Sequence, residues 1–254
     1  MTAPLQAGQI LLGLIKQGHP AGVSKGGATW DLVFHLAAWR TRDGEVDRGR
    51  LRCLMPVGDK SALQTWYPTV PGLGLVQFEV VRQEGPTLWV RHVSILDGDF
   101  ELEAVRRQLR EPVIVDDVEL GRLTLDRRLD VYQGTVQWNG HSISVMLSGA
   151  DPEQPQAVLD EAKSLLREQA AWDTLAREVA VAKLLPLKNS AWLQEGEDEI
   201  TSEVFALRMT LNTIDVSEGG EWSLFFDDDD MFGGHAIVVN GHLASKEIEA
   251  NIAG

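Results

Sequence analysis

The stretch that decides the fold is Trp222-Ser-Leu-Phe-Phe-Asp-Asp-Asp-Asp-Met-Phe-Gly-Gly-His-Ala-Ile-Val-Val-Asn240. Its two apolar runs, residues 222–226 and 236–239, are short and rich in aromatic or β-branched side chains, which is typical of buried strands. Between them lie four consecutive aspartates, an apolar pair and Gly233-Gly234, whose backbones can take a positive φ in a reversal. Because adjacent carboxylates repel one another, the sequence predicts two strands joined by a turn that is solvated or lies beside a cation.

This acidic turn is where the sequence concentrates possible chemistry. Its candidate binding residues are Asp227, Asp228, Asp229, Asp230 and His235. As a metal site, Asp227, Asp229 and His235 would offer oxygen and imidazole ligands to Mg²⁺ or Ca²⁺, the only cofactors that the sequence suggests. An EF-hand does not fit, because the turn lacks the glycine and the distal glutamate of that loop.

The other interpretation of the turn is structural. The carboxylates then form a solvated tip, and His235 caps the next strand by a hydrogen bond to that tip. Met231 and Phe232 follow the charges directly, and apolar residues in that position usually fold back to plug the end of a sheet. We favour the structural interpretation, with the apolar pair as a core plug.

Length and composition are those of a soluble globular protein. A chain of 254 residues can bury a sizeable core as one large domain or two ordinary ones. The longest apolar run near the start, Ile10–Ile15, is too short to cross a membrane, and we expect no secretory signal. The single cysteine, Cys53, excludes an intrachain disulfide and a multi-cysteine metal site, and its strand position predicts a buried thiol. These features predict a cytoplasmic protein.

The net charge of −15 is distributed unevenly along the chain. Residues 1–110 carry 13 Lys+Arg against 11 Asp+Glu, whereas residues 111–254 carry 10 against 27. Such a shift predicts two domains, 1–110 and 111–254, with different surfaces. The acidic domain should repel nucleic acid and membrane lipid, so a basic protein or a metal cation is its natural partner.

The first domain reads as mostly strand. The pattern predicts three strands, a helix that begins after the N-cap residue Asp59, and two further strands. This is the element order of an OB-type barrel, which other five-stranded folds share. The predicted strands cover 7–15, 30–37, 51–55, 75–82 and 88–95, and the predicted helix covers 59–67.

Basic and aromatic residues occur together in this first domain. On an OB-like barrel such residues can bind single-stranded nucleic acid. Acidic residues interrupt the arginines, however, and we favour ordinary exposed charges at a sheet edge as their explanation. The residues concerned are Arg40, Arg42, Arg48, Arg50, Arg52, Trp66, Tyr67 and Trp89.

The second domain is predicted to be α+β, with an antiparallel sheet and a helical hairpin. Strands over 120–147 form a meander, and Asn139-Gly140 is a strong type I′ hairpin signal. Two helices follow, the first beginning at Asp151 and the second ending at Pro186. Strands over 205–216, 222–227 and 235–240 complete the sheet, and 246–252 is a final strand or a short helix.

Residues from about 120 to 254 resemble a bacterial family catalogued as domain of unknown function 2262. The resemblance rests on motifs spread along the domain, the most specific being the segment from Phe226 to Ile237. The family pattern often has a glycine where this chain has Asp229, which makes the turn here more acidic. The resemblance implies a domain boundary and no assigned activity. The matching motifs are Leu120-Gly121, Gln137-Trp138, Leu185 to Trp192, Phe226-Asp227-Asp228, Met231-Phe232-Gly233-Gly234-His235-Ala236-Ile237 and Ile252-Ala253-Gly254.

These observations favour a non-catalytic binding protein whose acidic surface meets a basic partner. The sequence contains no Walker A loop, G-x-G-x-x-G, H-E-x-x-H, G-x-S-x-G or paired C-x-x-C. By analogy, bacterial toxin-neutralising immunity proteins fit such a role. Two alternatives remain open: a divalent-metal-dependent enzyme centred on Asp227, Asp229 and His235, and single-strand binding by residues 1–110.

Overall fold

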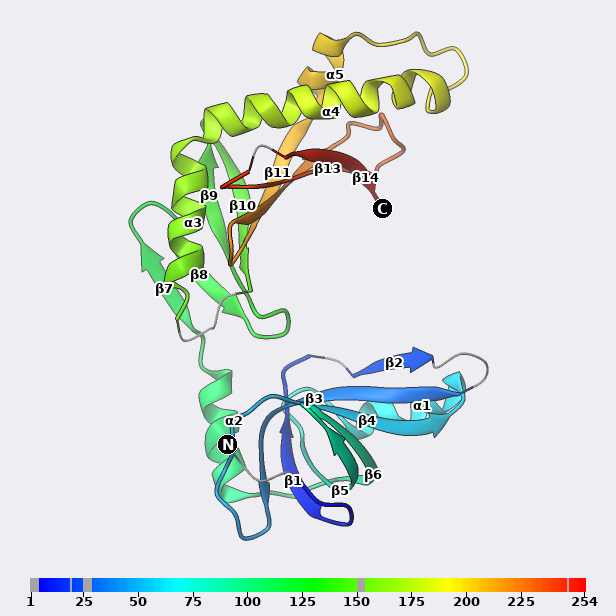
Figure 1. Ribbon diagram of the computed structural model, residues 1–254, viewed down its shortest axis with the longest axis vertical. Helices are drawn as coiled ribbons and strands as arrows, with labels where there is room; N and C mark the ends of the chain where they lie inside the picture. The colour runs from blue at the N-terminus through cyan, green and yellow to red at the C-terminus, as the bar shows by residue number, and fades with distance from the viewer. Residues whose placement is uncertain (1–4, 19, 25–28, 150–153, 246) are drawn as a thin grey trace. The chain divides into compact units, whose positions relative to one another are not determined.

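The computed structural model describes residues 5–18, 20–24, 29–149, 154–245 and 247–254. The chain divides into two compact units, which we call the N-terminal unit (Met1–Pro112 with Arg127–Leu129) and the C-terminal unit (Val113–Asp126 with Asp130–Gly254). Each unit has its own hydrophobic core, and both appear in Figure 1. Within the described ranges, we find no helix with the length and apolar character that a membrane crossing requires.

The N-terminal unit is a small barrel (Figure 1). Its sheet has the order β1-β5-β6-β4-β3-β2, and an additional pairing of β1 with β3 closes it. All neighbouring strands are antiparallel except β4 and β6, which are parallel. Its elements are β1 (Ile10–Ile15), β2 (Ala21–Ser24), β3 (Trp30–Thr41), β4 (Leu51–Gly58), α1 (Lys60–Trp66), the 3₁₀ turn η1 (Tyr67–Thr69), β5 (Leu75–Glu84), β6 (Thr87–Ile95) and α2 (Phe100–Arg110).

This circuit confirms the OB-like barrel. Apart from the short edge strand β2, the order around the barrel is β1-β3-β4-β6-β5 and back to β1, with α1 between β4 and β5, as in an OB fold. The predicted cap of α1 is present, since the Asp59 carboxylate accepts a hydrogen bond from the Ala62 amide at 3.0 Å. The barrel interior also holds Cys53, and burial raises the pKa of this thiol far above its usual range.

The C-terminal unit is an eight-stranded sheet with helices on it, an α+β arrangement. Its order is β14-β13-β12-β11-β10-β9-β8-β7, so the meander and the last hairpins keep their sequence order. Its elements are β7 (Ile114–Asp117), β8 (Gly121–Asp126), β9 (Val131–Trp138), β10 (His141–Ser148), α3 (Gln156–Arg167), α4 (Gln169–Ala191), α5 (Ser202–Arg208), β11 (Thr210–Ser217), β12 (Glu221–Asp227), β13 (Ala236–His242) and β14 (Glu249–Ala253).

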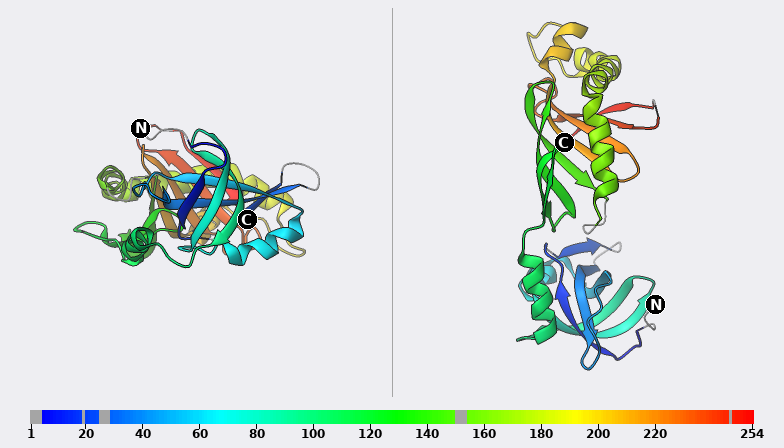
Figure 2. Two further views of the ribbon diagram at one scale, coloured as in Figure 1. Left: turned by 90° about the horizontal axis from the view of Figure 1, so that it is seen from below. Right: turned by 90° about the vertical axis from the view of Figure 1, so that its left-hand side faces the viewer.

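Two details of this sheet differ from the sequence-based prediction. One neighbouring pair, β10 and β11, is parallel, so the sheet is mixed rather than wholly antiparallel. The helices between these strands return the chain to the end of the sheet at which β10 began, so β11 can run parallel to β10. In addition, α3 and α4 do not fold back on each other as a hairpin. They meet at a steep angle (Figures 1 and 2), α3 packing on β10 and β11 and α4 on β13 and β14.

The boundaries of the helices in this unit also differ from the sequence-based prediction. Residues 151–153, where the first helix was predicted to begin, lie outside the described residues, and α3 starts at Gln156. Helix α4 runs through Pro186 to Ala191 instead of ending there, and the exposed position of the proline keeps its ring out of the core. Residues 202–208, partly assigned to a strand, form α5, which Thr201 caps by accepting a hydrogen bond from the Val204 amide.

Candidate functional site

The turn between β12 and β13 is organised around a buried aspartate. Asp228 is only 3% exposed. Its Oδ2 accepts hydrogen bonds from the amides of Phe232 at 2.6 Å and Gly234 at 3.3 Å, and its Oδ1 accepts one from Asp230 at 3.3 Å. Because these donors belong to the turn itself, Asp228 holds the loop closed and is not directed at solvent.

The predicted apolar plug is confirmed. Met231 and Phe232 are 1% and 0% exposed and belong to the core of the C-terminal unit. The Phe232 ring packs edge-on against Trp192, with centroids 5.7 Å apart, and against Phe205 of α5, with centroids 6.1 Å apart. The plug therefore joins the turn to the end of α4 and to α5.

The other carboxylates of the turn lie at the surface. Asp229 forms an ion pair with Arg208, whose Nε lies 2.8 Å from Oδ2. Asp227 accepts a hydrogen bond from the Asp229 amide at 2.9 Å. Asp230 is exposed, and both Asp229 and Asp230 have a positive φ, of 46° and 61°. An aspartate tolerates this conformation better than most residues do, which explains why the run can turn here without glycine.

His235 contacts an aromatic ring at this turn. Its ring packs edge-on against Trp192, with centroids 5.6 Å apart, and the expected hydrogen bond to the tip is absent from the contacts of the described residues. Across the described ranges, no group of three or more His, Cys, Asp or Glu side chains is arranged to hold a metal ion. Asp227, Asp229 and His235 border the same cleft, and their described contacts are with the turn, Arg208 and Trp192.

A second acidic segment is fixed beside this turn. The loop after α4 is closed by Asn189, whose side chain exchanges hydrogen bonds with the backbone of Ile200 at 2.9 and 3.1 Å. The Lys188 ammonium, 1% exposed, donates to the Trp192 carbonyl at 2.9 Å and to Glu197 Oε2 at 2.6 Å. Two hydrogen bonds lower the pKa of Glu197: the larger effect comes from the Gln194 amide and the smaller one from Lys188. The loop is therefore held in one conformation.

Trp192 and Arg208 bring the two acidic segments to the same end of the C-terminal unit. Trp192 precedes the loop and contacts the turn, while Arg208 binds Asp229 and its charge also acts on Glu197. Of the nine carboxylates in the two segments, Glu197 and Asp229 are paired with Lys188 and Arg208, and Asp228 is buried. We call this surface the acidic end, and its carboxylates are Glu195, Glu197, Asp198, Glu199, Glu203, Asp227, Asp228, Asp229 and Asp230.

A cleft of about 650 Å³ opens at the acidic end. Cross-strand neighbours Thr213 and Phe225 contribute to it from β11 and β12, and Met146 contributes from β10. Asn212 and residues 226–230 and 234–236 supply the rest of its lining. The cleft thus combines apolar surface with exposed carboxylates, the two features that a long cationic side chain needs.

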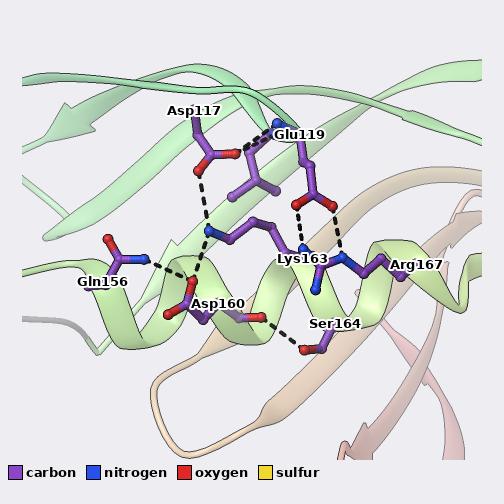
Figure 3. Close-up of polar contacts among 8 residues, drawn as sticks. Asp117, Glu119, Gln156, Asp160, Lys163, Ser164 and Arg167 are labelled. Atoms are coloured by element: carbon purple, nitrogen blue, oxygen red, sulfur yellow. Dashed lines mark hydrogen bonds and ion pairs between the residues drawn. The ribbon is translucent and has the colours of Figure 1, made fainter.

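A second group of charges in the same unit is built differently (Figure 3). Asp117 Oδ1 accepts from the amides of Glu119 and Leu120 at 2.9 and 3.0 Å, and Oδ2 lies 3.4 Å from Lys163 Nζ. Arg167 Nε donates to Glu119 at 2.9 Å. We call these contacts the α3 clamp, because they fasten α3 to the turn between β7 and β8.

Sequence reasoning missed several residues of the acidic end. Arg208 lies next to no acidic residue in the sequence, and Lys188 reads as an ordinary exposed helix residue. Met146 and Phe225 become neighbours of the cleft only through the pairing of β10, β11 and β12. The one sequence signal that could have located Trp192 is its position just before an acidic loop.

The outer face of the barrel forms a separate candidate surface. Arg52 on β4 lies opposite His35 of β3 and Thr87 of β6, and Trp89 on β6 lies opposite Arg82 of β5. Phe34, Cys53 and Leu88 alternate with these residues and point into the core, so the first set faces outward. The Arg82 guanidinium carbon lies 3.9 Å from the centroid of the Trp89 ring.

Comparison with known proteins gave one family and slight structural likenesses. Two structures of the single-stranded DNA-binding protein from Thermus aquaticus, the wild type and a deletion mutant, show 14% and 12% identity with TM-scores of 0.26 and 0.24. Each likeness covers 57% of this chain, and 75% and 77% of the respective chain. A search of curated proteins found no match. The family described as "Uncharacterized protein conserved in bacteria (DUF2262)" matches residues 117–252, more than half of the chain. The chain therefore belongs to the DUF2262 family.

Proposed function

We propose that the C-terminal unit is a non-catalytic binding module that takes a basic segment of a partner protein at the acidic end. The observation that carries this proposal is the excess of carboxylates there: Glu197 and Asp229 are paired with Lys188 and Arg208 and Asp228 is bound by backbone amides, whereas the contacts of the described residues give the other six no ion pair. Uncompensated charge at a fixed surface steers an oppositely charged partner and raises its association rate.

The cleft explains how such a partner would be held. An arginine or lysine has a long apolar stem and a charged head. The stem would lie along Met146 and Phe225, and the head would meet Asp227 or Asp230 at the rim. An arginine also stacks on an aromatic ring and pairs with a carboxylate through two parallel hydrogen bonds, so it suits this cleft better than a lysine does.

The arrangement of the turn favours this function over a metal-dependent enzyme. The Asp228 carboxylate accepts hydrogen bonds from backbone amides, and Asp229 is paired with Arg208. The His235 ring packs against Trp192. A basic protein, such as a toxin that an immunity protein would neutralise, needs only the exposed carboxylates that remain.

The test is binding of a labelled nine-residue peptide of alternating arginine and glycine, followed by fluorescence anisotropy with the full chain. We expect binding that weakens with salt and falls at least fivefold in the double variant Asp227→Asn/Asp230→Asn. The matched control is Glu168→Gln/Glu178→Gln, which removes two exposed carboxylates elsewhere on the same unit. Equal losses in both variants, or binding that ignores salt, would contradict the proposal.

A second candidate function belongs to the N-terminal unit: binding of single-stranded nucleic acid. The specific observation in its favour is the OB strand order, since oligonucleotides bind OB folds on the face of the second and third barrel strands. These are β3 and β4 here. Residues 1–95 carry 10 Lys+Arg against 7 Asp+Glu, in contrast to the acidic unit that follows. The test is binding of a labelled oligothymidylate, and its absence at low salt would remove this function.

A further inference from the structure

We infer that the outward residues of β4, β5 and β6 form the nucleic-acid site of the barrel, with Arg82 stacked on Trp89 as a platform for one base and Arg52 as a contact for a neighbouring phosphate. This site rests on the second proposed function; it shares β4 with the β3–β4 face named there and extends from it across β6 to β5. Trp89 follows Arg82 across the β5–β6 pairing, and Leu54, two residues beyond Arg52 along β4, lies opposite Trp89. The three residues therefore share one face of the barrel.

The platform is a guanidinium lying on an indole. The Arg82 guanidinium carbon is 3.9 Å from the Trp89 ring centroid, which is a close stacking distance. The Arg82 side chain is 55% exposed, and an ion pair with Glu84, at 2.7 Å, holds it from the side. A guanidinium plane is one of the surfaces on which proteins stack the splayed bases of single strands. A base placed on Arg82 would therefore extend an existing stack.

Arg52 supplies an uncompensated positive charge next to the platform. It is exposed, and the contacts of the described residues give its side chain no acidic partner. Its strand and that of Arg82 are separated by β6, a distance of about 10 Å across the strands. A phosphate at Arg52 and a base at Arg82 would then lie along a path that crosses the strands.

The acidic residues of this face, Glu79 and Glu84, each form an ion pair with an arginine. Arg91 is paired with Glu79, a contact that lowers the pKa of the glutamate, and the Arg91 side chain is 58% exposed. The Glu79 side chain is only 15% exposed and also contacts His92, whereas the Arg82–Glu84 pair is exposed at both residues. Exposed ion pairs contribute little to stability, so a phosphate can compete with Glu84 for Arg82. The arginines of this face outnumber its glutamates, so the face can bind a polyanion that the acidic C-terminal unit repels.

The experiment uses the full chain and fluorescein-labelled twelve-nucleotide oligothymidylate, with oligouridylate and a twelve-base-pair duplex as further probes. The single phosphate contact, at Arg52, predicts a loss of about threefold between 50 and 200 mM salt. Charge-conserving variants separate the two roles. We expect Arg82→Lys to weaken binding about five- to tenfold, because lysine has no plane to stack, and Arg52→Lys to change it less than twofold.

Charge reversal gives the second comparison. Arg52→Glu should weaken binding at least tenfold, whereas Arg107→Glu, an exposed position on α2, should change it less than twofold. If the wild type binds but the two reversals act equally, or Arg82→Lys binds as the wild type does, the site is wrong while the barrel's function stands. If the duplex binds as tightly as the single strand, base stacking plays no part and the inference fails. If no probe binds, the function itself fails.

Discussion

The C-terminal unit holds two groups of charges that look alike in the sequence and differ in the structure. In the α3 clamp, Asp117 and Glu119 face Lys163 and Arg167 and share hydrogen bonds with them. At the acidic end, carboxylates outnumber cations, and exposed ones such as Asp230 remain turned to solvent. Paired charges fasten an element in place, whereas unpaired charges are available to a partner. The difference shows that acidic composition alone does not identify a binding surface.

Asp228 is the exception within the acidic end and gives the largest expected effect. We expect Asp228→Ala to lower the free energy of unfolding by about 3 kcal/mol, because it leaves buried backbone amides without an acceptor. Urea denaturation measures the change, with Asp230→Asn as the control. Asparagine tolerates the positive φ at that position, so the control removes only an exposed charge. A loss below 1 kcal/mol for Asp228→Ala would mean that the turn does not depend on this carboxylate.

The clamp should respond to loss of its central aspartate. We expect Asp117→Ala to lower the free energy of unfolding by about 1–2 kcal/mol, since two amides of the β7–β8 turn lose their acceptor at a partly exposed site. Thermal unfolding measures the shift. Asp116→Ala, on the exposed neighbour, is the matched control. Equal effects of the two substitutions would erase the distinction between clamp and surface charge.

Acidification should weaken the clamp. Hydrogen bonds from backbone amides and Lys163 lower the pKa of Asp117, and the bond from Arg167 lowers that of Glu119. A carboxyl whose pKa is depressed by folding contributes stability above its unfolded pKa, near 4, and loses it as the pH falls through the folded value. We therefore expect the urea concentration at the unfolding midpoint to decrease as the pH is lowered below about 4. The decrease should be smaller in Asp117→Ala. An identical pH profile for both proteins would contradict this assignment.

The smallest effect is expected at the acidic end itself. Asp227→Asn/Asp230→Asn should change the free energy of unfolding by less than about 0.5 kcal/mol, because both side chains are exposed and asparagine keeps the local hydrogen-bonding oxygen. Differential scanning calorimetry measures this change.

The same instrument tests the metal hypothesis, for which we expect no increase in melting temperature with Mg²⁺ or Ca²⁺. A rise with either ion that the double variant abolishes would restore it.

Local patterns in the sequence predicted much of the fold. Asn139-Gly140 gives the tight turn that was expected, with φ of 48° and 83° and Trp138 opposite His141. Asp59 caps α1, and the alternation around Phe34 and Cys53 places both in the barrel interior. Each of these features depends on residues close together in the chain, where spacing alone limits the conformations available.

The elements that were missed depend on contacts between distant segments. Helix α5 is short and gains its stability from packing, for Arg177 of α4 donates hydrogen bonds to the carbonyls of Ala206 and Met209 at 2.7 Å. The parallel pairing of β10 with β11 requires the whole helical connection between them. Neither feature leaves a periodic signal in its own residues.

The sequence by itself determined the strand–turn–strand at 222–240, the order of strands and helix along the first domain, and the excess of negative charge in the second half of the chain. Only the tertiary structure decided which of those charges are used up, by burying Asp228 under its own loop, pairing Asp229 with Arg208 and turning His235 to Trp192. The physical reason is that charge is a property of each residue, whereas its compensation depends on burial and on partners that folding brings from elsewhere in the chain.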